Sequence, residues 1–204
     1  YGAGMYGLEK YINGKSPYKT WCYGSYCLLS INAEDDFSGV SSENTVINSG
    51  TDNLYGAAAL LSGLSGSAVD MPTGAYVKLI NGDYKYLLGT QRDAFRLKTR
   101  GIAFSLKPIT VFNDLYQNIS VTAREQHKIS YAEKFIDYLI SKKSDNVKLG
   151  LFADGIKLYD DELSALENLQ YDYKLSTPIS ESMKNEINKA IKNNDVNRLK
   201  NILK

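Results

Sequence analysis

The chain has 204 residues, of which 43% are apolar and 23% charged, so it is expected to fold into a globule rather than stay disordered. Its 24 basic and 23 acidic residues leave a formal net charge of +1, which gives no electrostatic reason to expect nucleic acid or an anionic membrane as a partner. No run approaches the roughly 20 apolar residues of a membrane helix, and no secretory signal is present, although a chain that begins at Tyr1 leaves its compartment open.

The first quarter of the chain, residues 1–52, is rich in glycine, tyrosine, serine and asparagine. A short apolar run at 27–31 predicts a buried strand. The Asp35-Asp36 pair and the polar stretch 41–53 predict loops and turns at the solvated surface. Residues 1–52 are therefore interpreted as a strand and loop region that belongs to an α/β lobe.

The chain has two cysteines, Cys22 and Cys27, and one histidine, His127. Two thiols need two further ligands to make a structural zinc site, so we expect no metal site and no cofactor. The cysteines form either a local disulfide or two reduced, half-buried thiols. His127 lies in a polar turn and is expected to be an exposed surface residue.

Residues 53–125 alternate between helical and extended patterns. The spacing of apolar residues predicts helices at 54–64, 75–80 and 91–98 and strands at 83–88, 101–106 and 115–121. The small residues of the first helix are typical of close packing against a sheet.

Residues 126–204 read as a helical C-terminal region. The patterns predict helices at 130–141, at 157–169, from Thr177-Pro178 onward and after a cap at Asp195. Together with the preceding strands, these helices predict an α/β fold with a helical C-terminal third.

A candidate binding site follows the strand predicted at 83–88. The strand stops at Gly89, and four polar residues then open a helix: Thr90, Gln91, Arg92 and Asp93. Open α/β folds bind ligands where strands end and helix N-termini begin. The alternative is that Arg92 and Asp93 form only a local ion pair or a helix cap.

Signals for catalysis are few. The sequence has no nucleophile elbow of the Gly-x-Ser-x-Gly type and no phosphate loop. Asp160-Asp161 fits a helix start, where the helix dipole favours acidic residues. We expect no catalytic residues, and a protein that is not an enzyme.

The order of these segments from about Asn53 to Lys204 resembles the C-terminal half of bacterial extracellular solute-binding proteins of sugar-type ABC transporters (family 1), the class that includes maltose-binding protein. Segment 75–89 is similar to the family's helix that turns at a glycine into a strand, and 101–108 to the next strand, which ends at a proline. Segment 130–141 is similar to the helix with the family's alanine, phenylalanine and leucine spacing.

The resemblance implies a three-layer αβα lobe of the type II periplasmic-binding-protein fold, and a chain that is a fragment of a two-lobe protein. Residues 53–125 would hold the second-lobe core and a crossover strand. The implied function is capture of a small polar solute, a sugar or similar, by hinge closure of an interlobe cleft. The implied partners are ABC transporter permease subunits, and the implied state is a monomer that is extracellular, secreted or lipid-anchored upstream.

Within that family, the loop after the strand equivalent to 83–89 faces the cleft, and sugar binders often place an aromatic residue there. The polar residues 90–93 of this chain imply a hydroxyl-rich or charged ligand bound through charge-assisted hydrogen bonds. Further ligand-binding candidates are Tyr76, Tyr116, Gln117 and Trp21, the last by stacking on a sugar ring.

Two alternatives stand beside this interpretation. A thiaminase I-like enzyme on the same scaffold would need Cys22 or Cys27 as a nucleophile, although neither has a neighbouring cation in sequence that would lower its pKa. An α/β interaction module would bind no small ligand. If the first lobe is missing, most of the apolar face of the C-terminal helices is expected to have no partner to pack against. Such exposed faces predict marginal stability and aggregation.

Overall fold

The computed structural model describes residues 18–50, 54–110, 115–119, 121, 123–153, 155–167, 169 and 181–203. Within these residues the larger of two β-sheets has the strand order β4-β3-β5-β2-β6. Its strands are β2 (Tyr26–Ser30), β3 (Thr45–Asn48), β4 (Ala68–Asp70), β5 (Tyr86–Thr90) and β6 (Ser105–Pro108).

The strand directions bring most of the strand ends to one edge of this sheet. β3 runs parallel to both β4 and β5, whereas β2 is antiparallel to β5 and to β6. The carboxyl ends of β3, β4, β5 and β6 therefore meet at one edge, and β2 begins at that same edge, where Tyr26 pairs with Thr90. We call it the carboxyl edge.

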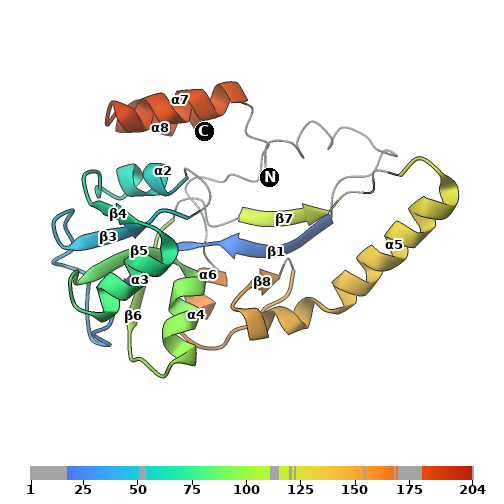
Figure 1. The fold of residues 1–204 in the computed structure, drawn as a ribbon, viewed down its shortest axis with the longest axis horizontal. Helices are drawn as coiled ribbons and strands as arrows, with labels where there is room; N and C mark the ends of the chain where they lie inside the picture. The colour runs from blue at the N-terminus through green and yellow to red at the C-terminus, as the bar shows by residue number, and fades with distance from the viewer. Residues whose placement is uncertain are drawn as a thin grey trace.

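The smaller sheet has the order β7-β1-β8 and consists of β1 (Tyr18–Gly24), β7 (Leu115–Ile119) and β8 (Phe152–Ala153). Both neighbours are antiparallel to β1. Figure 1 shows β1 and β7 running side by side away from the larger sheet. Because only Ser25 separates β1 from β2, one continuous stretch of chain joins the two sheets.

Side chains of the larger sheet alternate between two hydrophobic cores, as the two-residue period of a strand requires. One core takes Tyr26, Leu28, Ile47, Tyr86 and Leu88. The other takes Cys27, Leu29, Val46 and Leu87. Strands that are buried on both faces are typical of a sheet covered by helices on each side.

Helices cover both faces of the larger sheet. One face packs against α2 (Leu54–Leu61), α7 (Glu181–Lys192) and α8 (Val196–Ile202). The other packs against α3 (Pro72–Ile80), α4 (Gln91–Thr99) and α6 (Ser164–Glu167). Figure 1 shows these layers above and below the strands, so the predicted α/β class and three-layer αβα lobe are confirmed.

Close packing of α2 depends on its small residues. Ala57, Ala58 and Ala59 are buried, and a Cβ atom at Gly56 would lie 3.3 Å from the side chain of Ile191 on α7. The expectation that the C-terminal helices bury their stripes against little is therefore wrong for α7 and α8. These two helices complete one core of the lobe.

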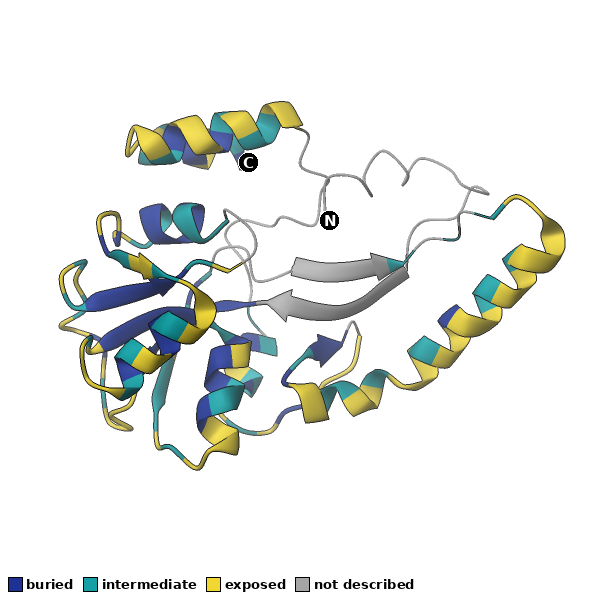
Figure 2. Cartoon of the chain, viewed as in Figure 1, coloured by how far each residue is buried: buried dark blue, intermediate teal, exposed yellow. Residues whose placement is uncertain are grey.

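Helix α5 (Gln126–Ser141) has a different environment. It is followed by the 3₁₀ turn η1 (Lys143–Leu149), and Figure 2 shows most of it exposed. Tyr131, Phe135 and Tyr138 are 71%, 58% and 57% exposed, and their spacing places them on one face of the helix. We call these three residues the α5 aromatic stripe. None of the described helices combines the length and apolar character that crossing a bilayer requires.

Several predicted elements differ from the structure. The stretch predicted as a loop at 41–53 contains β3, and β4 lies where no strand was predicted; both strands are too short to show a clear pattern. Strand β6 occupies 105–108 rather than 101–106; as an edge strand it tolerates Pro108, which pairs with Cys27. The helix predicted at 157–169 is wrong except for α6.

The reason for the missing helix is a side chain that binds backbone. The two carboxylate oxygens of Glu167 accept hydrogen bonds from the backbone N–H groups of Leu158 and Tyr159, each at 2.9 Å. Those bonds hold the chain in an irregular path. Asp161, predicted at a helix start, instead accepts a hydrogen bond from the backbone of Leu163 at 2.9 Å.

Candidate functional site

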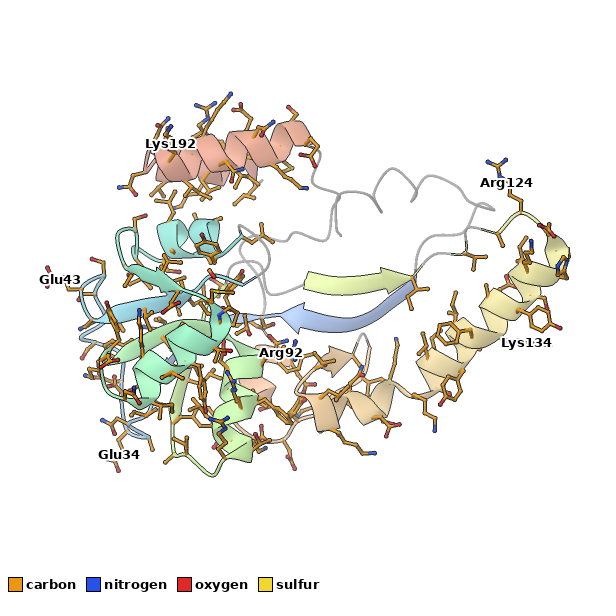
Figure 3. The ribbon with its side chains drawn as sticks, in the orientation of Figure 1. Glu34, Glu43, Arg92, Arg124, Lys134 and Lys192 are labelled. Atoms are coloured by element: carbon orange, nitrogen blue, oxygen red, sulfur yellow. The ribbon has the colours of Figure 1, made fainter. Side chains whose placement is uncertain are left out.

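The carboxyl edge collects polar residues from segments that are distant in sequence. Asn48 ends β3, Asp70 ends β4, Thr90 ends β5, and Ser25 precedes β2. Strands β1 and β7 also leave the lobe from this edge, so the candidate site faces the smaller sheet. Figure 3 shows Arg92 at the start of α4 on this side of the lobe.

Strand β5 passes into α4 without an intervening loop. Thr90 has the extended backbone of a helix N-cap, with φ −126° and ψ 173°. The Asp93 carboxylate reaches back and accepts a hydrogen bond from the Thr90 backbone N–H at 3.0 Å, which forms half of a capping box. This geometry explains why the polar residues stand where they do in the sequence.

Asp93 is a buried structural group. It is 4% exposed, and its Oδ2 atom also accepts a hydrogen bond from Asn48 Nδ2 at 2.8 Å. Burial raises the pKa of the Asp93 carboxyl above its usual range, against the opposing effect of these hydrogen bonds. The alternative interpretation of Asp93 as a helix cap therefore describes it better than a direct ligand contact.

The raised pKa of Asp93 predicts a pH dependence of stability. The folded chain holds the proton more tightly than the unfolded chain, so the free energy of unfolding falls as pH rises from about 3.9, the usual aspartate pKa, through the folded value. Asp93→Asn carries no such proton. We expect it to remove this slope in urea unfolding measured between about pH 4 and about pH 8.

A matched control for this experiment is Asp70→Asn. The side-chain hydrogen bond from Lys78 lowers the pKa of Asp70, so its stabilisation is fully present above the usual aspartate pKa and is lost only at lower pH. The control variant should therefore keep the parental slope. An unchanged slope in Asp93→Asn would show that Asp93 does not cause it.

Gln91 is also buried, and it binds the junction between the two sheets. Its side-chain Oε1 accepts a hydrogen bond from the Ser25 backbone N–H at 2.7 Å, and its own N–H donates to the Ser25 carbonyl at 2.9 Å. Like Asp93, Gln91 is committed to contacts inside the protein.

Arg92 differs from its two neighbours because its side chain is exposed. It forms no hydrogen bond or ion pair with the residues that the structure describes. Beside it, half-buried Thr90 lies at the strand end. Of the four polar residues predicted as a binding site, Arg92 and Thr90 are thus the two that are not buried.

The other predicted ligand contacts have different outcomes. Tyr76 is 1% exposed and lies between α3 and α4, with the guanidinium of Arg96 4.3 Å from its ring centre. This position removes Tyr76 from the site. Trp21 on β1 and Tyr116 and Gln117 on β7 belong to the strands that leave the carboxyl edge, but their side chains lie outside the described part of the structure.

Sequence reasoning missed Ser25 and Asn48. Ser25 shows no local signal, because its role comes from Gln91, which is distant in sequence. Asn48 could have been found if Thr45–Asn48 had been identified as a strand, since it would then be a polar residue at a strand end.

The remaining candidates for catalysis or metal binding are the cysteines, the histidine and clusters of acidic residues. Cys27 is a free, buried thiol, and burial raises its pKa well above the usual range, which opposes a nucleophilic role. The side chain of Cys22 falls outside the described residues. His127 is exposed beside Glu125, as predicted. The described ranges contain no group of three acidic, histidine or cysteine side chains arranged to bind a metal ion.

Comparison with known proteins gives one weak structural likeness and no family. No protein-family model matches the chain, and no curated protein matches it. Among solved structures, it is similar to substrate-binding domain 2 of GlnP from Lactococcus lactis in its open conformation, with 20% sequence identity and a TM-score of 0.37. The match covers 64% of this chain and 56% of that domain. At this level of likeness, the fold rests on the strand order described above.

Proposed function

We propose that the chain is the larger part of one lobe, with its connecting strands, of a solute-binding protein that serves an ABC-type importer. The solute would bind at the carboxyl edge, between this lobe and a second one. The protein would release the solute to permease subunits at the outer face of the membrane. Membership of the sugar-type family stays a prediction, so we propose a small polar solute of broader chemistry.

The observation that carries this proposal is the path of the chain at the carboxyl edge. Antiparallel strands β1 and β7 leave the lobe from the same edge at which the parallel strands end. Ligands bind outside the carboxyl ends of strands in open α/β sheets. A pair of connecting strands beside such an edge can act as a hinge, which lets two bodies close on a ligand between them.

The available side chains favour a particular ligand chemistry. With Asp93 and Gln91 buried, the exposed charge among the four predicted polar residues is the Arg92 guanidinium at the positive end of α4. Its planar fork suits a carboxylate, a phosphate or paired hydroxyl groups. We therefore propose a solute that carries an anionic group.

Binding in this scheme needs no covalent chemistry. Arg92 and Thr90 would hold one side of the solute, and closure would bring a second set of donors and acceptors to the other side. Exclusion of water strengthens these contacts because charged hydrogen bonds are stronger at low dielectric. One lobe alone would therefore bind weakly.

The α5 aromatic stripe is consistent with a second lobe. Helix α5 contacts β1 but leaves Tyr131, Phe135 and Tyr138 exposed, although residues of this type normally bury much of their surface. We propose that the second lobe covers this stripe. The proposal would also explain why α5 extends away from the larger sheet in Figure 1.

A panel of solutes tests the proposed function. The native protein, as its source produces it, is heated with neutral sugars, sugar acids, phosphorylated sugars, amino acids or dicarboxylates. A solute present at 100 times its Kd stabilises the folded state by about 2.7 kcal/mol, which raises Tm by roughly 5–10 °C. We expect anionic solutes to give the shift. A well-folded protein with no shift across the whole panel would contradict the proposal.

A further inference from the structure

A single residue joins the two sheets of the protein. Ser25 follows β1, which belongs to the smaller sheet, and precedes β2, which belongs to the larger one. On one side Gly24 pairs with Leu115 of β7, and on the other Tyr26 pairs with Thr90 of β5. The direction in which β1 leaves the lobe therefore depends on the backbone at Ser25.

Gln91 binds both backbone polar groups of this junction. The Ser25 N–H donates to Gln91 Oε1 at 2.7 Å, and the Ser25 carbonyl accepts from the Gln91 N–H at 2.9 Å. Both residues are fully buried. Two hydrogen bonds to one residue restrict rotation at the junction more than one bond would, because both peptide planes beside Ser25 are held.

The position of Gln91 connects this junction to the proposed binding site. Gln91 is the first residue of α4, and Arg92 is the next. A movement of the start of α4 would act directly on Ser25, and a rotation at Ser25 would act on the start of α4. The other anchor of this region is Asp93, which fixes the first turn of α4 to Asn48 and Thr90.

We propose that Gln91 is a positioning residue that sets the direction of β1 relative to the larger sheet and couples it to the Arg92 site. This inference rests on the proposed hinge role of β1 and β7. Its test needs no solute, so failure to find a solute would leave the result unaffected.

The test compares Gln91→Met, which keeps the size of the side chain and removes its acceptor, with the parent chain. Spin labels are placed through noncanonical amino acids, which leaves both cysteines unmodified. One pair joins Glu34 to Lys134, two exposed residues at opposite ends of the molecule in Figure 3. A second pair joins Glu34, in the turn after β2, to Lys192, the last residue of α7, which packs on the larger sheet.

Loss of the acceptor should free the junction without loosening the lobe. We expect the Glu34–Lys134 distance distribution to broaden in Gln91→Met, while the Glu34–Lys192 distribution keeps its parental width. Hydrogen exchange at the Ser25 amide should become faster by roughly 10- to 100-fold, the range expected for loss of one buried hydrogen bond.

Gln126→Met is the matched control, because Gln126 is the first residue of α5 and is exposed. It should leave both distributions unchanged. Gln91→Asn, whose amide is one methylene too short to reach Ser25, should repeat the broadening if the methionine variant fails to fold. An unchanged Glu34–Lys134 distribution in a folded Gln91 variant would overturn the proposal, and so would equal broadening of both pairs.

Discussion

Replacing Gly89 with alanine is expected to lower the free energy of unfolding by roughly 2–4 kcal/mol, a large effect for one methyl group. A Cβ atom at Gly89 would lie 2.6 Å from Asp93 Oδ2, which is too close for any carbon–oxygen contact. The carboxylate would have to move. Its departure would leave the buried donor of Asn48 and the partly buried backbone donor of Thr90 without their acceptor.

A double-mutant cycle with Asp93→Ala separates this cause from a general weakening of β5. If the clash with the carboxylate is responsible, Gly89→Ala adds little once Asp93 is already alanine. Gly39→Ala is the matched control, since its Cβ would meet the Tyr86 hydroxyl at an ordinary 3.5 Å. Equal losses from Gly89→Ala in both backgrounds, measured by urea unfolding, would disprove the steric explanation.

Replacing Arg92 with alanine is expected to raise the Kd of an anionic solute by roughly 10- to 100-fold, because charge-assisted hydrogen bonds contribute about 1.5–3 kcal/mol. Stability should change by no more than about 0.5 kcal/mol, since the side chain is exposed. Arg92→Lys should recover only part of the affinity, because an ammonium group lacks the planar fork. Isothermal titration of the native protein and its variants measures both effects.

Arg124→Ala provides the comparison for Arg92. Arg124 is exposed like Arg92, and it also lies near the start of a helix, since α5 begins at Gln126. Figure 3 shows Arg124 beside α5, far from the carboxyl edge. The Arg124→Ala protein should bind the solute with the affinity of the parent protein. If both arginine variants lost affinity equally, the effect would come from net charge and not from a contact at the proposed site.

The sequence predicted the elements whose patterns are long or sharply bounded. Helix α5 has four turns of clear periodicity, and the polar residues after Gly89 mark the start of α4. The strand before it was predicted at 83–88 but occupies Tyr86–Thr90, so it does not stop at Gly89. Strands β3 and β4 were missed because four and three residues are too few to establish alternation. The last helix was predicted correctly because Asp195 caps it, accepting a hydrogen bond from the Arg198 N–H at 2.9 Å.

The place of the candidate residues in the fold was predicted, but the environment of each side chain was not. Sequence placed Gln91, Arg92 and Asp93 together at a strand end, and the structure agrees. It could not tell which of them faces solvent. That distinction depends on Ser25 and Asn48, whose contacts with α4 form only when distant segments assemble. Tyr76 was misplaced for the same reason, since its neighbour Arg96 comes from another helix.

The antiparallel strand β2 has a consequence for synthesis. It lies between β5 and β6 in the sheet, yet both of these partners follow it in the chain. A ribosome therefore releases β2 with both of its edges unpaired, and it must wait until β6 has emerged. Its apolar residues Leu28 and Leu29 would be exposed meanwhile, and unpaired apolar strands are prone to aggregate. Pairing of this sheet should therefore be completed only after β6, Ser105–Pro108, has left the ribosome, and a holding chaperone should increase the yield of folded protein.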